Sequence, residues 1–316
     1  MSNNFWYELP KPFFILAPME AVTDVVFRHV IKHAGSPDVF FTEFTNATGW
    51  AHAGDKAIGG RLIKTDDEHP LVAQLWGSDP TCMEQMALHC AELGFDGIDI
   101  NMGCPEATAV KSGGGAGMIR TPENATAIID AAKKSGLPVS VKTRLGYSRV
   151  DEWPEWLGHI LRQDVVNLTI HLRSKKEMSK VPAHYELIPE IKKLRDDIAP
   201  DTLLTINGDI NDRTHGLELV NKYDVDGVMI GRGVFHNPYA FETNQKEHTR
   251  DDMINLLKIQ LDLYDKYSKQ TGRPFDTLKR FFKIYIREFD GAAELRDRMM
   301  HTKSTDEVRS LIASIR

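Results

Sequence analysis

Short apolar runs rich in β-branched residues alternate with amphipathic segments along the first three quarters of the chain. Each run is apolar at successive positions rather than at every second one, which is typical of strands buried on both faces of a parallel sheet. Eight such runs occur, at 13–19, 39–44, 71–77, 97–102, 139–145, 167–173, 203–207 and 227–231.

The segments between the runs carry helix start signals. Asp24 precedes VVFRHVIKHAG, and Asp79 with Pro80 opens TCMEQMALHCAELG, so both segments are expected to begin with a side-chain cap. Eight strand and helix units close naturally into a (β/α)8 TIM barrel of the α/β class. An open doubly wound sheet is the alternative, but its Gly-rich dinucleotide turn is missing after the first run, which continues as APMEAVTD.

The strand pattern stops near residue 245, where helical periodicity takes over. We therefore expect two domains, a barrel over 1–244 and a small all-helical domain over 245–316. Its middle segment, FDTLKRFFKIYIREF, is expected to form one helix with Lys279, Lys283 and Arg287 on one face at four-residue spacing. Such a stripe fits a solvated helix face, and it also fits contacts to phosphate groups.

Composition and charge narrow the class of protein. Hydrophobic residues make up 41% and charged residues 27% of the chain, which is ordinary for a globular protein. The formal net charge is −6, yet Lys and Arg outnumber Asp and Glu from residue 250 onward, which fits a polyanionic partner and equally a solvated helical surface. No apolar run reaches the ~18 residues of a membrane span, and the N-terminus lacks a secretory pattern. We expect a cytoplasmic protein that does not bind membranes.

Three cysteines occur, Cys82, Cys90 and Cys104, and their spacing is not that of metal ligands. An odd number of cysteines without that spacing predicts neither a disulfide framework nor a zinc site. We therefore expect reduced thiols and no metal.

Polar residues close most of the apolar runs, at positions where a core strand has no need of them. In a TIM barrel the carboxyl ends of the strands surround one mouth, so these residues are expected to converge on a polar ligand. The last two strand ends, INGDI and IGRG, offer backbone N–H groups beside an arginine. Barrels commonly bind phosphate at this position, so the pattern predicts a phosphorylated cofactor. The strand-end residues are Pro18, Met19, Glu20, Gln74, Asn101, Cys104, Lys142, Arg144, His171, Arg173, Asn207, Gly208, Asp209, Gly231 and Arg232.

The loop KSGGGAG, which follows Cys104, lacks the Lys-Ser/Thr pair of a P-loop and the dinucleotide spacing. We interpret it as a flexible turn that lets the Cys104 loop fold close to a ligand.

Six motifs, in order along the chain, resemble the strand-end motifs of the tRNA-dihydrouridine synthases. They are APMEAVTDVVFR, QLWG, NMGCP followed by KSGGGAGMI, VKTRLG, INGDI and VMIGRG, and the tail LKRFFKIYIREFDGAAELRDRM is similar to the tRNA-binding helices of that family. The resemblance implies an FMN-dependent TIM barrel with a helical tRNA-binding domain. It also implies reduction of the C5=C6 bond of uridines in tRNA, with NADPH or NADH recharging the flavin.

The resemblance also implies a role for each matching residue. Cys104 would supply a proton to C5 while reduced flavin supplies a hydride to C6. Lys142 would lie at the flavin N1 and C2 oxygen, while Gln74 and the Met19 backbone would bind the ring. The residues assigned to the phosphate side of the cofactor are His171, Asn207, Gly208, Gly231 and Arg232, and neighbouring cofactor contacts are assigned to Pro18, Glu20 and Asp209. The residues assigned to tRNA or uracil are Asn101, Arg144, Arg173, Lys279, Lys283 and Arg287.

Two departures and two rival functions stay open. The family usually has His-Gly-Arg-Thr and Ala-Asp-Trp where this chain has HLRSKK and AHYELI, so Leu172, His184 and Tyr185 affect the details of that loop. An FMN barrel acting on a free pyrimidine would need no basic helical tail, and a non-catalytic tRNA-binding protein would need no Cys104. A uridine in folded tRNA must be extruded to reach a barrel mouth, which gives the tail a purpose. We expect a monomer.

Overall fold

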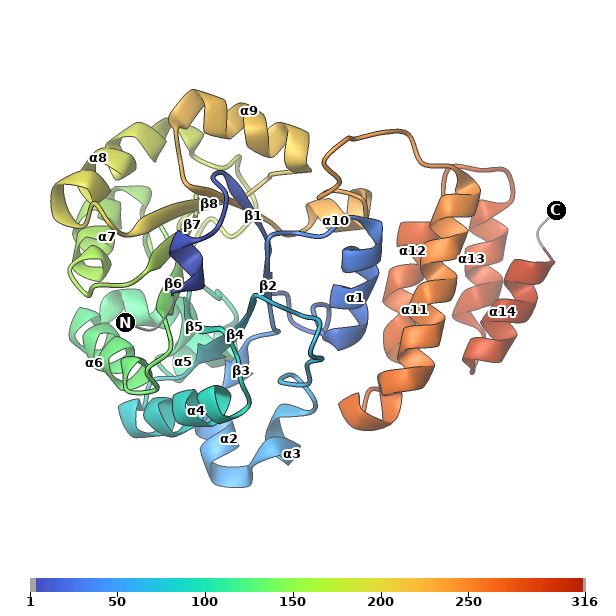
Figure 1. Ribbon diagram of the computed structural model, residues 1–316, viewed down its shortest axis with the longest axis horizontal. Helices are drawn as coiled ribbons and strands as arrows, with labels where there is room; N and C mark the ends of the chain where they lie inside the picture. Colours follow the sequence, from blue (N-terminus) through green and yellow to red (C-terminus); the bar gives the residue numbers. More distant parts are fainter. Residues whose placement is uncertain (1–3, 315–316) are drawn as a thin grey trace.

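The computed structural model describes residues 4–314, which form a closed barrel of parallel strands with a helical region on one side (Figure 1). Every strand pairs in parallel with its neighbours, and pairing of β2 with β4 closes the sheet. The predicted TIM barrel is therefore confirmed. The strands are β1 (Phe13–Leu16), β2 (Val39–Phe41), β3 (Thr45–Asn46), β4 (Leu71–Trp76), β5 (Gly97–Met102), β6 (Val139–Arg144), β7 (Asn167–His171), β8 (Leu203–Asn207) and β9 (Gly227–Ile230).

The second predicted run is interrupted. It forms β2 and then leaves the ladder, and the two-residue strand β3 resumes pairing with β4 further on. Glu43 lies in the interruption with a fully buried side chain, and the backbone N–H of Ala21 donates to its carboxylate. The run therefore breaks where a carboxylate turns toward the loop after β1.

Helices between the strands cover the outside of the barrel (Figure 1). The predicted caps are present, because Asp24 accepts the N–H of Phe27 and Asp79 accepts the N–H of Cys82. The barrel helices are α1 (Val25–Ala34), α2 (Ala47–Ala53), α3 (Asp55–Ile58), α4 (Pro80–Glu92), α5 (Ala107–Lys111), α6 (Pro122–Lys133), α7 (Trp153–Leu161), α8 (Ile188–Ile198), α9 (Arg213–Tyr223) and α10 (Gly233–His236). The short helices α2, α3 and α5 were not predicted.

The amino end of the barrel is closed by the N-terminal 3-10 turn η1 (Phe5–Tyr7). Trp6 of this turn is fully buried, and its ring contacts the rings of Phe13 and Phe41 with centroids 5.8 and 6.4 Å away. Above this apolar plug the barrel interior is polar and satisfied by internal hydrogen bonds. Its fully buried side chains include Gln74, Asp99, Ser140, Asn167, Thr169 and Thr205.

The C-terminal helical region packs against α1, with the rings of Phe27 and Phe281 stacked at 5.0 Å. It consists of α11 (Arg250–Thr271), the 3-10 helix η5 (Phe275–Phe281), α12 (Phe282–Tyr285), α13 (Ala292–Met300) and α14 (Thr305–Ala313).

The prediction of one helix over FDTLKRFFKIYIREF was wrong. The segment forms η5 and then a single α-helical turn that ends at Tyr285, because Ile284, Tyr285 and Ile286 are all buried. A regular helix packed on one side cannot bury three successive residues. The basic stripe is lost with the helix: Lys283 is exposed, but Lys279 pairs with Asp276 at 2.7 Å and Arg287 donates to the carbonyl of His236.

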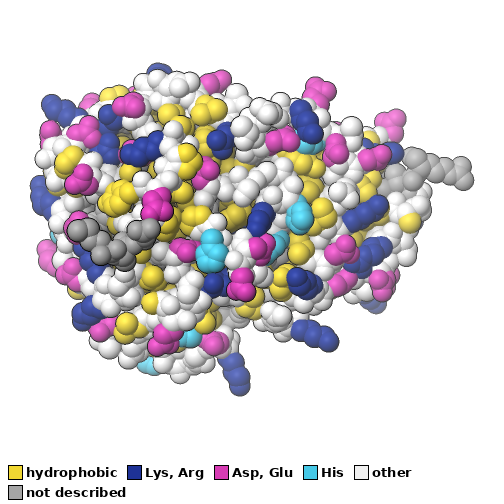
Figure 2. Space-filling view, viewed as in Figure 1, with side chains coloured by type: hydrophobic (Ala, Val, Ile, Leu, Met, Phe, Trp, Pro, Cys, Tyr) yellow, Lys and Arg dark blue, Asp and Glu magenta, His cyan; other side chains and the backbone are white. Residues whose placement is uncertain are grey.

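Two surface properties bear on partners. Among residues 4–314 there is no helix of the length and apolar character that a membrane crossing demands. Acidic and basic side chains are interspersed over the face drawn in Figure 2. That face includes the amino end of the barrel, where the dark blue η1 turn lies in front in Figure 1.

Candidate active site

Two cavities lie at the carboxyl ends of the barrel strands, and the loop after β1 lines both. The first cavity, of about 600 Å³, includes Met19, and the second, of about 330 Å³, includes Glu20 and Cys104. Volumes of this order suit small organic ligands. The first cavity brings together nine residues predicted to contact a cofactor: Pro18, Met19, Lys142, His171, Asn207, Gly208, Asp209, Gly231 and Arg232.

Two cations, Lys142 and Arg232, line the first cavity together with the carboxylate of Asp209. Lys142 donates to Asn207 Oδ1 at 3.2 Å, and its burial, followed by the nearby Arg144, lowers its pKa to about 8. Burial and the same cations hold the pKa of His171 well below its ordinary value, so its imidazole is neutral at pH 7. Among the described residues nothing bonds to the buried His171 Nδ1. An anionic ligand with further acceptor atoms fits this set.

The loops after β8 and β9 form a narrow cradle on the same cavity. Gly208 has φ +121°, a conformation that favours glycine, and a Cβ on Gly233 would lie 2.1 Å from the carbonyl oxygen of Asn211. Asp209 accepts from Arg173 and lies 3.4 Å from Arg232, so it holds two guanidinium groups beside the cradle. Arg232 keeps 60% of its side chain exposed and can meet an anion.

Cys104 lies on the wall of the second cavity, after β5. Its backbone N–H donates to Asn101 Oδ1 at 2.8 Å, and its carbonyl accepts the N–H of Ala116 at 2.9 Å. Burial raises the pKa of its thiol, so the thiol is protonated at neutral pH. The glycine-rich segment continues into the 3-10 helix η2 (Gly115–Arg120) and packs tightly on this loop, since a Cβ on Gly115 would lie 2.7 Å from the Cys104 carbonyl oxygen. The glycines therefore permit a close approach, and the segment is packed rather than a free turn.

A buried chain of hydrogen bonds supports the Cys104 loop from below. Asp99 Oδ2 accepts from Gln74 Nε2 at 2.6 Å, and Gln74 Oε1 accepts from Asn101 Nδ2 at 3.0 Å. Burial raises the pKa of Asp99 to about 6, an effect opposed by its hydrogen bonds to Ser140 and Gln74. Gln74 is thus occupied inside the barrel and is not part of the first cavity's lining.

Sequence reasoning missed Asp99, although one signal was present. In the run GIDINM the polar residues Asp99 and Asn101 are two positions apart, so they share a face of the strand. A carboxylate on the inward face of an otherwise apolar strand needs buried donors, and that requirement points to a polar interior.

The predicted uracil and tRNA residues lie in different places. Arg144 is buried and donates to the carbonyl oxygens of Gly103, Ser174 and Met178. Arg173 donates to the Val181 carbonyl at 2.6 Å as well as to Asp209. Both arginines therefore hold strand-end loops. Glu20 is apart from the other predicted cofactor residues, paired with Arg61 on the second cavity. Lys279, Lys283 and Arg287 lie in the helical region and line neither cavity.

The departures at 172 and 184–185 affect the first cavity indirectly. Leu172 is fully buried in the core, and His184 lies 2.9 Å from both Glu177 and Glu186. The Tyr185 hydroxyl donates to the carbonyl of Gly208 at 2.5 Å. Tyr185 thus braces the cradle rather than facing the cavity.

Comparisons with known proteins give one consistent family. The model of the family described as dihydrouridine synthase matches residues 15–315. A Bacillus subtilis (strain 168) protein named "Probable tRNA-dihydrouridine synthase 2" is 61% identical over 313 residues, covering 99% of this chain and 96% of the relative. A Staphylococcus epidermidis protein (strain RP62A) named "Probable tRNA-dihydrouridine synthase" is 58% identical over the same number of residues, with the same coverage.

Solved structures share the fold at low sequence identity. A histamine dehydrogenase from Rhizobium sp. 4-9 has a TM-score of 0.52 and 12% identity, covering 78% of this chain and 46% of that one. A 2-naphthoyl-CoA reductase has a TM-score of 0.51 and 9% identity, covering 72% and 49% respectively. This chain spans about half the length of either structure, and the likeness concerns the fold alone.

Proposed function

This chain belongs to the dihydrouridine synthase family, and on that premise we propose that it is an FMN-dependent enzyme that reduces specific uridines of tRNA to 5,6-dihydrouridine. The observation that supports the proposal most directly is the shared wall of the two cavities. One loop carries Met19 into the first cavity and Glu20 into the second cavity, that of Cys104. A cofactor and a substrate base could therefore meet at that wall.

The first cavity fits FMN by the chemistry of its residues. The cradle of Gly208, Gly231 and Arg232 suits the phosphate, and the unpartnered Nδ1 of His171 offers one more contact. Lys142 would lie at the N1 and C2 oxygen edge of the ring, where a positive charge favours the reduced form. When bound and reduced by NADPH or NADH, the flavin supplies the hydride that goes to C6 of uracil.

Cys104 completes the reaction by giving a proton to C5. Its thiol is protonated at neutral pH, because burial raises its pKa, so it can act as a general acid without a neighbouring base. Asn101 holds the cysteine backbone at 2.8 Å, which fixes the thiol on the cavity wall. Arg144, by binding the Gly103 carbonyl, fixes the residue before it.

The helical region is the proposed tRNA-binding domain, beginning near residue 245 and including Lys279, Lys283 and Arg287. A uridine buried in folded tRNA must be extruded at a cost of a few kcal/mol, and a separate binding surface can offset that cost. We also propose that the protein acts as a cytoplasmic monomer without a metal. Among residues 4–314 there is no group of three His, Cys, Asp or Glu residues placed to hold one.

The decisive experiment uses the purified full chain, NADPH and tRNA from cells that lack this gene. We expect a yellow protein that releases one FMN per chain on denaturation and adds two hydrogens to tRNA uridines. Arg232→Ala should lose flavin, whereas Arg309→Ala, in the helical region, should keep it. A colourless protein that takes up no added FMN would overturn the proposal. Reduction of free uracil or uridine at rates equal to tRNA would favour the free-pyrimidine alternative.

A further inference from the structure

The loop between β1 and α1 is held in an unusual conformation at the wall of both cavities. Ala21, next to Glu20, has φ +57°, a left-handed backbone that is unfavourable for a residue with a side chain. Such a conformation persists only where the surroundings determine it. Both backbone groups of Ala21 are bound: its N–H donates to Glu43, and its carbonyl accepts from Arg280 at 3.1 Å.

Glu43 links this loop to the C-terminal helical region. Its side chain is fully buried, and the guanidinium that meets it belongs to Arg273, which follows α11 and is distant in sequence by 230 residues. Arg273 also lies 3.9 Å from Asp24 at the end of the same loop. Without Arg273, Glu43 would be a buried carboxylate that has lost its ion-pair partner, which is a strongly unfavourable state.

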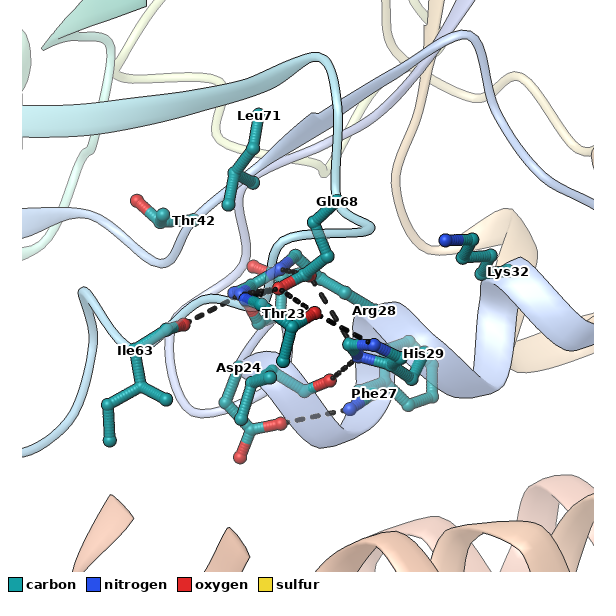
Figure 3. Close-up of polar contacts among 12 residues, drawn as sticks. Thr23, Asp24, Phe27, Arg28, His29, Lys32, Thr42, Ile63, Glu68 and Leu71 are labelled. Carbon is teal, nitrogen blue, oxygen red and sulfur yellow. Dashed lines mark hydrogen bonds and ion pairs between the residues drawn. The ribbon is translucent and has the colours of Figure 1, made fainter. Parts of the chain in front are cut away.

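The other end of the loop is anchored within the barrel (Figure 3). Arg28 forms a buried ion pair with Glu68, with Nε and Oε1 2.6 Å apart, and its Nη1 donates to the carbonyl of Thr23 at 2.9 Å. The Thr23 hydroxyl accepts the N–H of Met19 at 3.0 Å. The barrel alone therefore fixes Thr23, whereas Ala21 is fixed through Arg273 and Arg280 of the helical region.

We propose that Glu43 and Arg273 are positioning residues that couple the packing of the helical region to the shared wall of the two cavities. Thr23 of the barrel holds the Met19 end of the loop, and Arg273, by holding Glu43 in its buried position, fixes the adjoining Glu20–Ala21 part of the same wall. The consequence for catalysis rests on the function proposed above, but the structural coupling does not. The C-terminal region is then a part of the active site's framework as well as a binding surface.

Hydrogen exchange measured by mass spectrometry on the full chain tests the coupling directly. In Arg273→Gln the peptide covering 17–24 should exchange at least about tenfold faster, the equivalent of one charge-assisted hydrogen bond. Peptides from β5 to β8 should keep their protection. The Kd for FMN should change by less than about tenfold, because Met19, which lines the first cavity, keeps its hydrogen bond to Thr23.

A second substitution separates coupling from general damage. Glu43→Gln combined with Arg273→Gln removes both charges, so no buried carboxylate is left unpaired, and the amide oxygen introduced at position 43 can still accept the Ala21 N–H. Exchange in 17–24 should then fall between wild type and Arg273→Gln. If Arg273→Gln does not fold, Glu43→Gln carries the test, with exchange in this peptide about fivefold faster because its hydrogen bond is no longer charge-assisted.

Arg309→Gln is the matched control, since this arginine of the helical region also holds two carboxylates, Asp262 and Asp265. It should leave exchange in 17–24 unchanged. The coupling would be refuted if peptide 17–24 of Arg273→Gln exchanged at the wild-type rate. It would also be refuted if this peptide exchanged faster in the double variant than in Arg273→Gln. Failure of wild-type protein to bind FMN would instead refute the proposed function and leave the exchange result standing.

Discussion

The ammonium of Lys142 on β6 donates to the side-chain oxygen of Asn207 on β8 at 3.2 Å, past the intervening strand β7. Asn207 can present that oxygen because its Nδ2 donates to the carbonyl of Met229 at 2.8 Å. The amide is therefore oriented before any ligand arrives. A buried cation with a single fixed acceptor retains donors for an anionic ligand.

The charge of Lys142 should make flavin binding depend on pH. Its pKa is lowered to about 8 by burial and by Arg144, so the charge is lost as pH rises through that value. FMN affinity, measured by fluorescence titration between pH 6.5 and 9.5, should weaken above about pH 8. Lys142→Met should weaken FMN binding over the whole pH range and abolish the fall in affinity above about pH 8. If FMN affinity falls at the same pH in Lys142→Met, another group causes the fall.

The same substitution should stabilise the protein without flavin. A lysine whose pKa is lower in the folded than in the unfolded state destabilises the fold below the folded value, and stability rises as pH increases from about 8 toward 10.5. Lys142→Met removes that penalty. The melting temperature at pH 7 should increase for the flavin-free protein and change much less at pH 10. A lower melting temperature for flavin-free Lys142→Met at pH 7 would contradict this assignment.

Asp99→Asn should lower the pH at which Lys142 loses its charge and FMN affinity falls. The carboxylate of Asp99 is a negative neighbour that supports the charge of Lys142, and its own pKa is raised to about 6 mainly by burial. An asparagine keeps the size and can still accept from Gln74, but it carries no charge. FMN affinity should then begin to fall below pH 8. Ser140→Ala, which removes only one hydrogen bond to Asp99, is the control and should shift this pH less.

Cys104→Ala should retain FMN, tRNA affinity and flavin reduction by NADPH, because none of these steps uses the thiol. Dihydrouridine formation should fall by ~10²–10⁴-fold, the usual contribution of a general acid. Single-turnover reduction of tRNA by pre-reduced enzyme measures this step. Cys82→Ala and Cys90→Ala, both on α4, should affect stability at most. Turnover by Cys104→Ala within about threefold of wild type would mean that the thiol only packs.

The basic residues of the helical region should contribute unequally to tRNA binding. Lys283 is exposed, so Lys283→Gln should reduce the slope of log K against log salt by about 0.9 or less. Arg287→Gln should also lower stability, because it breaks the contact with His236 of α10. Lys222→Gln on α9 is the control for a general charge effect. Identical salt slopes for wild type and Lys283→Gln would exclude a phosphate contact at that lysine.

The sequence was sufficient for the barrel because eight continuous apolar runs admit few other closed arrangements. The convergence of Lys142, His171, Asn207 and Arg232 followed, since all carboxyl ends of a parallel barrel face one mouth. Gln74 was predicted to bind the flavin ring, and that stays a prediction; its bonds to Asp99 and Asn101 could not be predicted, because local pattern does not reveal which residues of neighbouring strands a side chain contacts.

Long-range contacts account for two errors in the predicted secondary structure. The run VFFTEF reads as one strand, but Glu43 leaves the ladder to meet Arg273 from the far end of the chain. The segment after Pro274 reads as one amphipathic helix, but Ile284, Tyr285 and Ile286 are buried in succession and the helix ends at Tyr285. Both outcomes depend on partners that lie outside any local window.

The Trp6 plug and the filled polar interior leave the amino end of the barrel sealed. Under the proposed function, the reductant and the uridine would then both enter through the mouth at the carboxyl ends of the strands, and we expect that the two do not occupy it together. On that expectation, the reductant has to depart before tRNA docks, so the kinetics should be of the ping-pong type. Initial-rate plots against NADPH at several fixed tRNA concentrations should give parallel lines, and each substrate should inhibit competitively against the other at high concentration.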